Sequence, residues 1–490
     1  MAQLEAPPAV AAPPVLRGSL GVTAIVFMVV AAAAPLTVVG GAAPLGILLG
    51  NGIGYPALYI VAAVILLLFA VGLAAMTRHV PKPGAFFTYV GYGLGRSSGL
   101  AAAWVAMLAY TTIQIAVYGY LGYVLSYTVQ TMTHVQLPWW IFSLLVIGLV
   151  ALLGYRHIDL SSKVLGVVLV AEVGIVLVLV AVVIVRGGPQ GLSLAPFAPA
   201  NVLSGSPGVG LMMAIAAFIG FEAAAIFRDE ARDPDRTIPR ATYTAVIGIG
   251  VFYTLAGWGL VMAWGPDHVV AEAAKDPGSL ILRTMAVYLG TAGEVITNVL
   301  LITSMLACVL SFHNVLTRYQ HSMSHAGVLP ERVGAVHHRH LSPHVSSLVQ
   351  TATAILCTVV FAALGLDPVL AVFTWFSGVA TVAIALLMAA TSAAVIVYFR
   401  RTRKDARVWN TVIAPGLGVV GLMLATALIV VNFPVMVGDV DPKGAPTFGP
   451  LCWFLLLLVA VFPIIGYAQA RWIRIRRPAA YAKLIDTIAG

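Results

Sequence analysis

Long apolar stretches alternate with short polar segments along the whole chain. Twelve of these stretches contain about twenty residues or more, which is the length an α-helix needs to cross the hydrocarbon core of a bilayer. The pattern therefore predicts an all-α membrane protein with 12 transmembrane helices. The predicted spans cover residues 19–49, 54–77, 98–127, 138–155, 163–186, 208–227, 241–264, 290–317, 345–365, 368–399, 409–432 and 447–470.

Composition excludes the other broad classes of protein. Hydrophobic residues make up 60% of the 490 residues and charged residues only 9%, with a mean hydropathy of +0.98. Soluble enzymes, secreted scaffolds and disordered proteins have far more polar surface. Each of the three cysteines, Cys308, Cys357 and Cys452, lies in an apolar run without a CxxC spacing, which indicates packing residues.

The basic residues indicate an orientation. Of the 27 Lys and Arg residues, 23 fall in the first tail and the even-numbered loops, and only Arg186, Lys275, Arg283 and Lys443 fall on the other side. Positive residues in short loops stay in the cytoplasm, so we expect a cell-membrane protein with both termini cytoplasmic. Residues 1–18 are expected to form a disordered cytoplasmic tail and 474–490 a second tail. This orientation accounts for the pI of about 9.5 without a nucleic-acid partner.

Two of the spans contain helix-breaking residues. The span 19–49 is too long for one upright helix and contains Pro35, Gly40, Gly41 and Pro44. The span 208–227 places Gly220 and the ionisable Glu222 inside the membrane. Both helices are expected to be interrupted, although glycine and proline also kink helices that are simply packed.

The two interruptions occupy matching places in the chain. They lie about 185 residues apart, and each is followed by four further spans. Two units of five helices predict inverted repeats over 19–186 and 187–400, with 401–473 adding two more helices. Paired interruptions in inverted halves mark the substrate site of many transporters, because irregular backbone at that depth survives where it lines a cavity.

Several motifs carry a family resemblance. Together they resemble the amino acid-polyamine-organocation (APC) superfamily of permeases, over about Gly21 to Arg400. The matching segments are Gly220-Phe221-Glu222, Asp229-Glu230-Ala231-Arg232-Asp233-Pro234 and Arg236-Thr237-Ile238-Pro239-Arg240; Pro81 to Tyr89; Phe312-His313-Asn314 with Arg318-Tyr319; and Gly327-Val328-Leu329-Pro330 with Ser342-Pro343.

The resemblance implies a fold of five plus five helices with an amino-acid-like substrate between the breaks of spans one and six. By this resemblance, an aromatic gate falls at Phe218 or Phe221. Family members often carry Gly-x-Gly at the first break, whereas this chain has Ala32 to Thr37 followed by Gly40-Gly41, and Pro35 has no N–H to donate. The residues implied at the substrate site are Ala34, Pro35, Thr37, Gly40, Gly41, Phe218, Ile219, Gly220, Phe221 and Glu222.

Two carboxyl groups lie deep in apolar spans. Glu172 is about ten residues from the nearer end of its span, and a charge there costs roughly 2.5 to 3.5 kcal/mol. Glu222 is six residues from Arg228. We interpret both as proton-coupling residues, with a hydrogen-bonded neutral acid and an interfacial position as the respective alternatives. Glu294, near an outer helix end, is interpreted as interfacial.

Polar residues in other spans are ambiguous. Gln114 and Tyr118 lie four residues apart and share a helix face, so they either face a substrate cavity or bond to neighbouring helices. Thr303 and Ser304 are possible ion-site residues by the resemblance alone. Six histidines between 321 and 344 crowd one loop, but without the ligand spacing of a zinc site, so we expect neither a metal nor a cofactor.

The sequence favours a secondary active transporter for an amino acid or related amine, working by alternating access and coupled to protons. It has no GxxxxGK[ST] motif for nucleotide binding, and we expect no enzymatic activity. The expected partners are the small-molecule substrate, protons and membrane lipid. The alternatives are an exchanger of amino acids or polyamines, a channel and a sensor.

Overall fold

The computed structural model describes residues 20–80, 86–156, 162–222, 224, 231–337, 342–441, 443 and 445–488. Within these ranges the chain forms helices and no β-strand, apart from two isolated bridges at Leu20–Ala231 and Val440–Pro446. The predicted all-α class is therefore confirmed. The expected tail over 1–18 and parts of two family motifs, Pro81 to Ala85 and Asp229-Glu230, lie outside the described residues.

Besides the 3₁₀ helix η3 (Gly52–Gly54), the described first half of the chain contains ten α- and π-helical segments. They are α1 (Val22–Ala32), α2 (Pro35–Thr37), the π-helical η1 (Val38–Ala42), α3 (Ala43–Leu45), the π-helical η2 (Gly46–Asn51), α4 (Tyr55–Thr77), α5 (Phe86–Leu94), α6 (Arg96–Thr133), α7 (Trp139–Tyr155) and α8 (Ser162–Arg186).

The second half is equally helical. It contains α9 (Pro199–Val202), α10 (Pro207–Ala216), α11 (Pro234–Trp264), α12 (Val269–Lys275), α13 (Leu280–His325), α14 (His344–Ala363), the π-helical η8 (Pro368–Phe373), α15 (Thr374–Thr402), α16 (Ala414–Val437), α17 (Pro450–Arg476) and α18 (Pro478–Ile488).

Many of these segments are long and apolar enough to cross a membrane. Nine such segments occur in the described part of the chain, the first running from Val22 to Thr77 and including the breaks described below. The shorter apolar helices Trp139–Tyr155 and Pro207–Ala216 occupy two further predicted spans. The chain is thus a multi-pass membrane protein, while 12 crossings and the inverted repeats remain predictions.

The first span leaves helical geometry at Ala34. Helix α1 ends at Ala32, Ala34 has a left-handed backbone with φ 46°, and α2 begins at Pro35. Proline has no N–H to continue the hydrogen bonds of α1 and is well suited to the first turn of a new helix. The break therefore precedes Gly40 and Gly41, which lie inside the π-helical η1.

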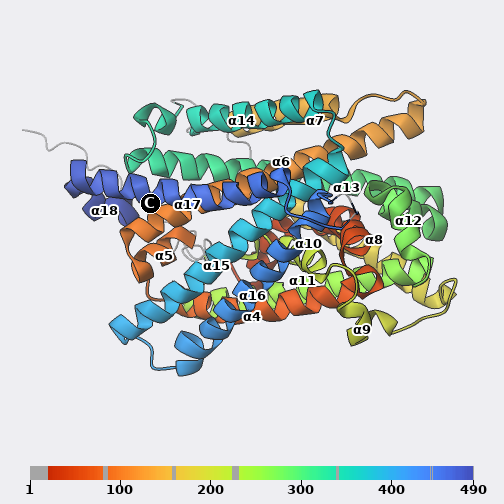
Figure 1. The fold of residues 1–490 in the computed structure, drawn as a ribbon, viewed down its shortest axis with the longest axis horizontal. Coiled ribbons are helices and arrows are strands. Elements are labelled where there is room, and N and C mark those ends of the chain that lie inside the picture. The colour runs from red at the N-terminus through yellow and green to blue at the C-terminus, as the bar shows by residue number, and fades with distance from the viewer. Residues whose placement is uncertain are drawn as a thin grey trace, which may run out of the picture.

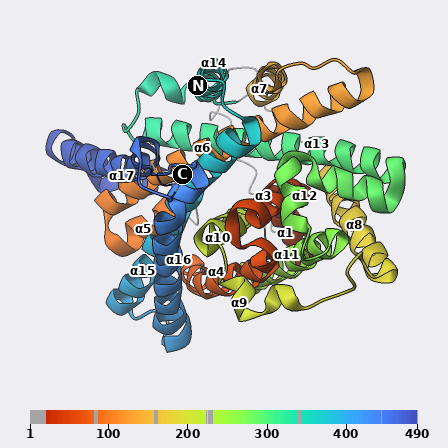
Figure 2. The same ribbon diagram turned by 45° about the vertical axis from the view of Figure 1, so that its right-hand side comes forward.

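The sixth span is interrupted just after α10. Helix α10 ends at Ala216, and Gly220 has φ 111°, which favours glycine. The two interrupted segments are also tied together, because Ser206 N–H donates to the Gly50 carbonyl at 2.9 Å. Gly50 and Gly210 are close enough that a Cβ on Gly50 would come within 2.8 Å of the Gly210 Cα. Figure 2 shows α1, α3 and α10 gathered beside α11.

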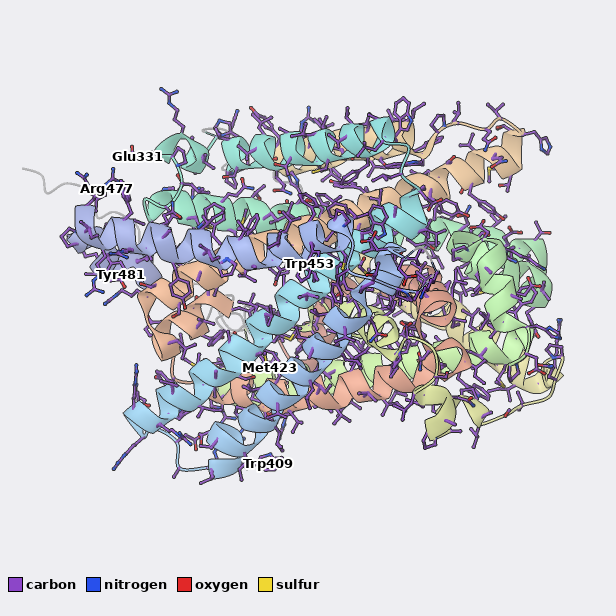
Figure 3. The ribbon with its side chains drawn as sticks, in the orientation of Figure 1. Glu331, Trp409, Met423, Trp453, Arg477 and Tyr481 are labelled. Carbon is purple, nitrogen blue, oxygen red and sulfur yellow. The ribbon has the colours of Figure 1, made fainter. Side chains whose placement is uncertain are left out.

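One end of the helix bundle collects the basic loops. There Arg78 donates to the Asp235 carbonyl at 2.6 Å, and Ser97 and Tyr481 bond at 2.9 Å. Figure 1 shows α5 and α18 at this end and α9 and α12 at the opposite one. Figure 3 places Glu331, Arg477 and Tyr481 at the same basic end. We call these the basic end and the opposite end.

Candidate functional site

A cavity lies between the two interruptions. Its walls come from the first break, α6, the second break, α13 and the start of the η8–α15 segment. A concave site with a mostly apolar wall is typical of small-molecule sites. The lining residues are Ala33, Ala34, Thr37, Val38, Ala42, Ile113, Val117, Met213, Ala216, Ala217, Ile219, Cys308, Phe312, Phe373 and Ser377.

The first break contributes two of its predicted residues to this lining. Ala34 and Thr37 line the cavity, whereas Pro35, Gly40 and Gly41 are buried without belonging to the wall. A Cβ on Gly40 would come within 2.9 Å of the Tyr120 Oη, and one on Gly41 within 3.0 Å of the Phe373 Cζ. The two glycines thus let aromatic rings pack directly against the helix backbone.

The second break contributes Ile219, together with Ala216 and Ala217. The predicted aromatic positions lie elsewhere: Phe218 packs against Tyr253 with ring centroids 6.0 Å apart, and Phe221 packs edge-on against Phe69 at 5.9 Å. The aromatic rings in the cavity wall are instead Phe312 and Phe373.

Glu172 links α8 to the first break. Its Oε2 accepts a hydrogen bond from Ser304 Oγ at 2.8 Å and a longer one from Leu36 N–H at 3.4 Å. Because the break removes the carbonyls that the first amides after it would otherwise meet, Leu36 N–H needs another acceptor. The side chain of Glu172 is only 4% exposed, so this carboxyl group joins three helical segments inside the bundle.

Glu222 has the corresponding position at the second break. Its Oε2 accepts from Gly220 N–H at 2.9 Å, and its Oε1 accepts from Tyr110 Oη of α6 at 2.7 Å. The residue is 8% exposed. Each interruption therefore has one backbone N–H bound by one buried carboxyl group. Gly220 and Glu222, both predicted at the substrate site, lie outside the cavity wall.

Gln114 bonds to neighbouring helices, and its Nε2 also donates to Tyr118 Oη of the same helix at 3.4 Å. Neither residue lines the cavity. Gln114 Nε2 donates to the Val309 carbonyl at 3.1 Å, and its Oε1 accepts from Gln350 Nε2 at 2.8 Å. Gln320 Nε2 then donates to Gln350 Oε1 at 3.0 Å. These contacts form a buried amide chain across α6, α13 and α14. The residues of α6 in the cavity wall are Ile113 and Val117.

Two aromatic layers flank the cavity. Towards the opposite end, Tyr120 packs on Phe373 with ring centroids 5.2 Å apart and donates to the Gly278 carbonyl at 3.1 Å. Towards the basic end, Tyr110 packs against Phe312 and Tyr319, each at 6.0 Å. We call these the Tyr120 layer and the Tyr110 layer.

Sequence reasoning missed several lining residues. Phe312 belongs to one of the family motifs, but the motif does not show which way the Phe312 side chain points. Ser377 and Cys308 lie in spans that are apolar on all sides, so no periodicity marks the face that meets the cavity. The missed residues are Ala33, Val38, Ala42, Ile113, Val117, Met213, Ala216, Ala217, Cys308, Phe312, Phe373 and Ser377.

The histidine-rich loop is partly described. His321 and His325 have ring centroids 4.3 Å apart, and His337 and His344 lie 5.4 Å apart. No group of three or more His, Cys, Asp or Glu side chains that could hold a metal ion occurs among the described residues. His338 and His340 lie outside them.

Comparison with known proteins identifies relatives of this sequence. The model of the amino acid permease family matches residues 18–462. The low-affinity putrescine importer PlaP of Escherichia coli K12 is 24% identical over 351 residues, 70% of this chain and 74% of that protein. The branched-chain amino acid permease BcaP of Bacillus subtilis is 24% identical over 313 residues, covering 60% and 65%. The aspartate-proton symporter of Bacillus subtilis is 23% identical over 202 residues, covering 40% and 39%.

These similarities confirm the resemblance. The family match extends over nearly the whole chain, including every described element that surrounds the cavity. Its members are transporters rather than enzymes. The chain belongs to the amino acid permease family, within the APC superfamily.

Proposed function

We propose that this protein is a secondary active transporter that moves an amino acid or related amine across the cell membrane by alternating access, coupled to protons. One observation carries the proposal: a cavity lies between two interrupted helices, and each interruption has a buried carboxyl group bound to its backbone. Sites of this kind near the middle of the membrane are typical of transporters with broken helices.

Alternating access requires that only one route to the cavity opens at a time. The Tyr120 layer and the Tyr110 layer are the two barriers in this proposal. Parts of both interrupted helices reach these layers, since Gly41 packs under Tyr120 and Glu222 binds Tyr110. Tilting either interrupted helix changes the contacts of one layer, while the long helices α6 and α13 provide a frame.

Glu172 and Glu222 are the proposed proton-coupling residues. Ionisable groups inside membrane helices are expensive and commonly mark proton pathways. Each of these carboxyl groups holds the backbone of one break, so gain or loss of a proton changes the hydrogen bonds that fix that break. The proposal includes inverted repeats over 19–186 and 187–400, and cytoplasmic termini.

Uptake by the purified full-length protein in liposomes tests the proposal. Labelled putrescine, leucine and aspartate are offered with and without an inward proton gradient, because the names of the relatives include a putrescine importer, a branched-chain amino acid permease and an aspartate-proton symporter. We expect gradient-driven accumulation of at least one of them. Glu172→Gln and Glu222→Gln keep the shape of the side chain but replace the ionisable carboxyl group with an amide. Each substitution should therefore abolish the increase in uptake caused by the proton gradient.

Glu294→Gln is the matched control, because Glu294 is a half-buried carboxyl residue of α13, four residues after the kink at Gly290 and outside the cavity wall. It should transport like the wild type. If Glu172→Gln and Glu222→Gln both take up substrate at wild-type rates with unchanged pH dependence, the coupling role of the two carboxyl groups is contradicted. Uptake only into solute-loaded vesicles favours an exchanger, and flux without saturation favours a channel.

A further inference from the structure

Two hydroxyl groups in the cavity wall lack hydrogen-bond partners. Thr37 and Ser377 both line the cavity and are 5% and 1% exposed. Neither Oγ has a partner among the described residues. A buried hydroxyl without a partner costs about 1–3 kcal/mol, so such groups in a cavity indicate that a bound molecule supplies the missing hydrogen bond.

Neighbouring residues show how a buried hydroxyl is normally satisfied in these helices. Thr381 and Thr391 of α15 donate to the carbonyls four residues earlier, at 2.7 and 2.8 Å. For Thr37 the carbonyl four residues earlier belongs to Ala33, on the far side of the break. Because of the break, the Thr37 hydroxyl cannot donate to the carbonyl four residues earlier, as it would in a continuous helix. The hydroxyl is therefore available to a molecule in the cavity.

The remainder of the wall is apolar. Apart from Thr37, Ser377 and the thiol of Cys308, the lining side chains are aliphatic, aromatic or thioether groups. Hydrogen bonding by lining side chains is therefore concentrated in two hydroxyls, contributed by the first break and by α15. A cargo that matches this wall has a compact polar group and an apolar body.

The charges around the cavity decide which polar group fits. Glu172 and Glu222 are buried, while no lysine or arginine is buried in the described part of the chain. A carboxyl group supplies no positive charge in either protonation state. Leu36 N–H, a backbone donor at the first break, is already bound by Glu172. A cargo carboxylate therefore finds no cationic partner here.

An ammonium group fits the same surroundings. Hydroxyl oxygens accept hydrogen bonds from it, and the rings of Phe312 and Phe373 in the wall attract cations through their π faces. Glu172, which binds the N–H of Leu36 next to Thr37, adds favourable charge whenever it is ionised.

We infer that Thr37 and Ser377 form an ammonium subsite, and that the cargo is a primary amine with an apolar body whose recognition does not require a carboxylate. This inference rests on the proposed transport function and specifies its substrate class. Ser377 is the residue that it adds to the site.

Binding to the purified full-length protein tests the subsite without requiring transport. Isothermal titration in detergent compares n-butylamine, leucinamide and N-acetylleucine. The first two carry an ammonium group without a carboxylate, and the third carries a carboxylate without an ammonium group. We expect the two amines to bind and N-acetylleucine not to bind.

Thr37→Val and Ser377→Ala remove the hydroxyls with little change in shape, and each should weaken amine binding by about tenfold or more. Ser392→Ala is the matched control, because Ser392 is a buried, unpartnered serine of the same helix α15 outside the cavity wall. It should bind like the wild type. Ser377→Ala lies within a continuous helix, so it tests the inference even if Thr37→Val does not fold.

The inference is overturned if N-acetylleucine binds in preference to leucinamide, if no amine binds to the folded protein, or if Ser377→Ala and Ser392→Ala behave alike. Amine binding with the expected variant effects, but without uptake in liposomes, contradicts the transport function and leaves the subsite intact.

Discussion

At the scale of single residues, the hydrogen bond between Tyr110 and Glu222 provides a direct test of the second break. Tyr110→Phe removes the 2.7 Å donor and leaves a buried carboxyl oxygen without it. We expect a loss of about 1–3 kcal/mol in stability, measured as a lower apparent Tm of the purified protein. Gly220 N–H remains as the second donor, so the protein should still fold.

Tyr319→Phe is the natural comparison for Tyr110→Phe. Tyr319 packs against Tyr110, is also buried, and has a hydroxyl without a partner among the described residues. Removing that hydroxyl should leave the Tm nearly unchanged. Equal effects of the two substitutions indicate that ring packing, rather than the bond to Glu222, determines stability here.

Some site residues were predictable because they are unusual in an apolar run. Glu172 and Glu222 stand out as charges inside the membrane, and Pro35 predicted a break close to Ala34 and Thr37. Gln114 and Tyr118 were correctly assigned to one helix face, but that face meets Val309 and Gln350 rather than the cavity. In a helix that is buried on several sides, spacing shows which residues lie together and not which neighbour they meet.

At the scale of secondary-structure elements, the second interruption depends on the backbone of Gly220. Its φ of 111° is strained for any L-amino acid. Gly220→Ala should therefore destabilise the protein by about 1–3 kcal/mol, seen as a lower apparent Tm and faster proteolysis. Gly248→Ala serves as the control, because a Cβ there meets nothing within 4 Å in the helix α11.

Gly248→Ala should be neutral or slightly stabilising, since alanine favours a helix interior over glycine. If Gly220→Ala is tolerated as well as Gly248→Ala, the second break does not depend on the positive φ of this glycine. The first break differs, because Ala34 adopts its φ of 46° without a glycine.

The elements themselves were predictable to the extent that hydrophobicity determines them. The span predicted to begin at residue 290 coincides with a kink at Gly290, but α13 already begins at Leu280. Residues 280–289 include Arg283, so the hydropathy pattern did not count them as part of the apolar span. Helices α5, α12 and α18 were missed as helices, because they are short and lie outside the apolar runs that the pattern detects.

At the scale of the whole molecule, the uneven distribution of basic residues was readable from the sequence alone, and the helix ends that carry them meet in space. Tyr398 Oη donates to the His79 carbonyl at 3.1 Å, and Ser342 Oγ donates to the Tyr155 carbonyl at 2.7 Å. In the same region, a hydrogen bond from Arg407 lowers the pKa of Asp405 to about 2, so this pair stays ionised at neutral pH. Long-range contacts of this kind could not be predicted, because hydropathy carries no information on which loops are neighbours.

Labelling of introduced cysteines tests the proposed orientation. Ala406 is exposed beside the Asp405–Arg407 pair at the basic end, and Ala200 is exposed in α9 at the opposite end. Arginine and lysine side chains resist translocation across the membrane, so the basic end should face the cytoplasm. In intact cells a membrane-impermeant maleimide should label Ala200→Cys, whereas Ala406→Cys should react only after the membrane is opened.

The wild type gives the background, since Cys308 and Cys452 are buried and Cys357 is half-buried. Labelling of Ala406→Cys alone in intact cells shows the opposite orientation, and it also reverses which aromatic layer faces the cytoplasm.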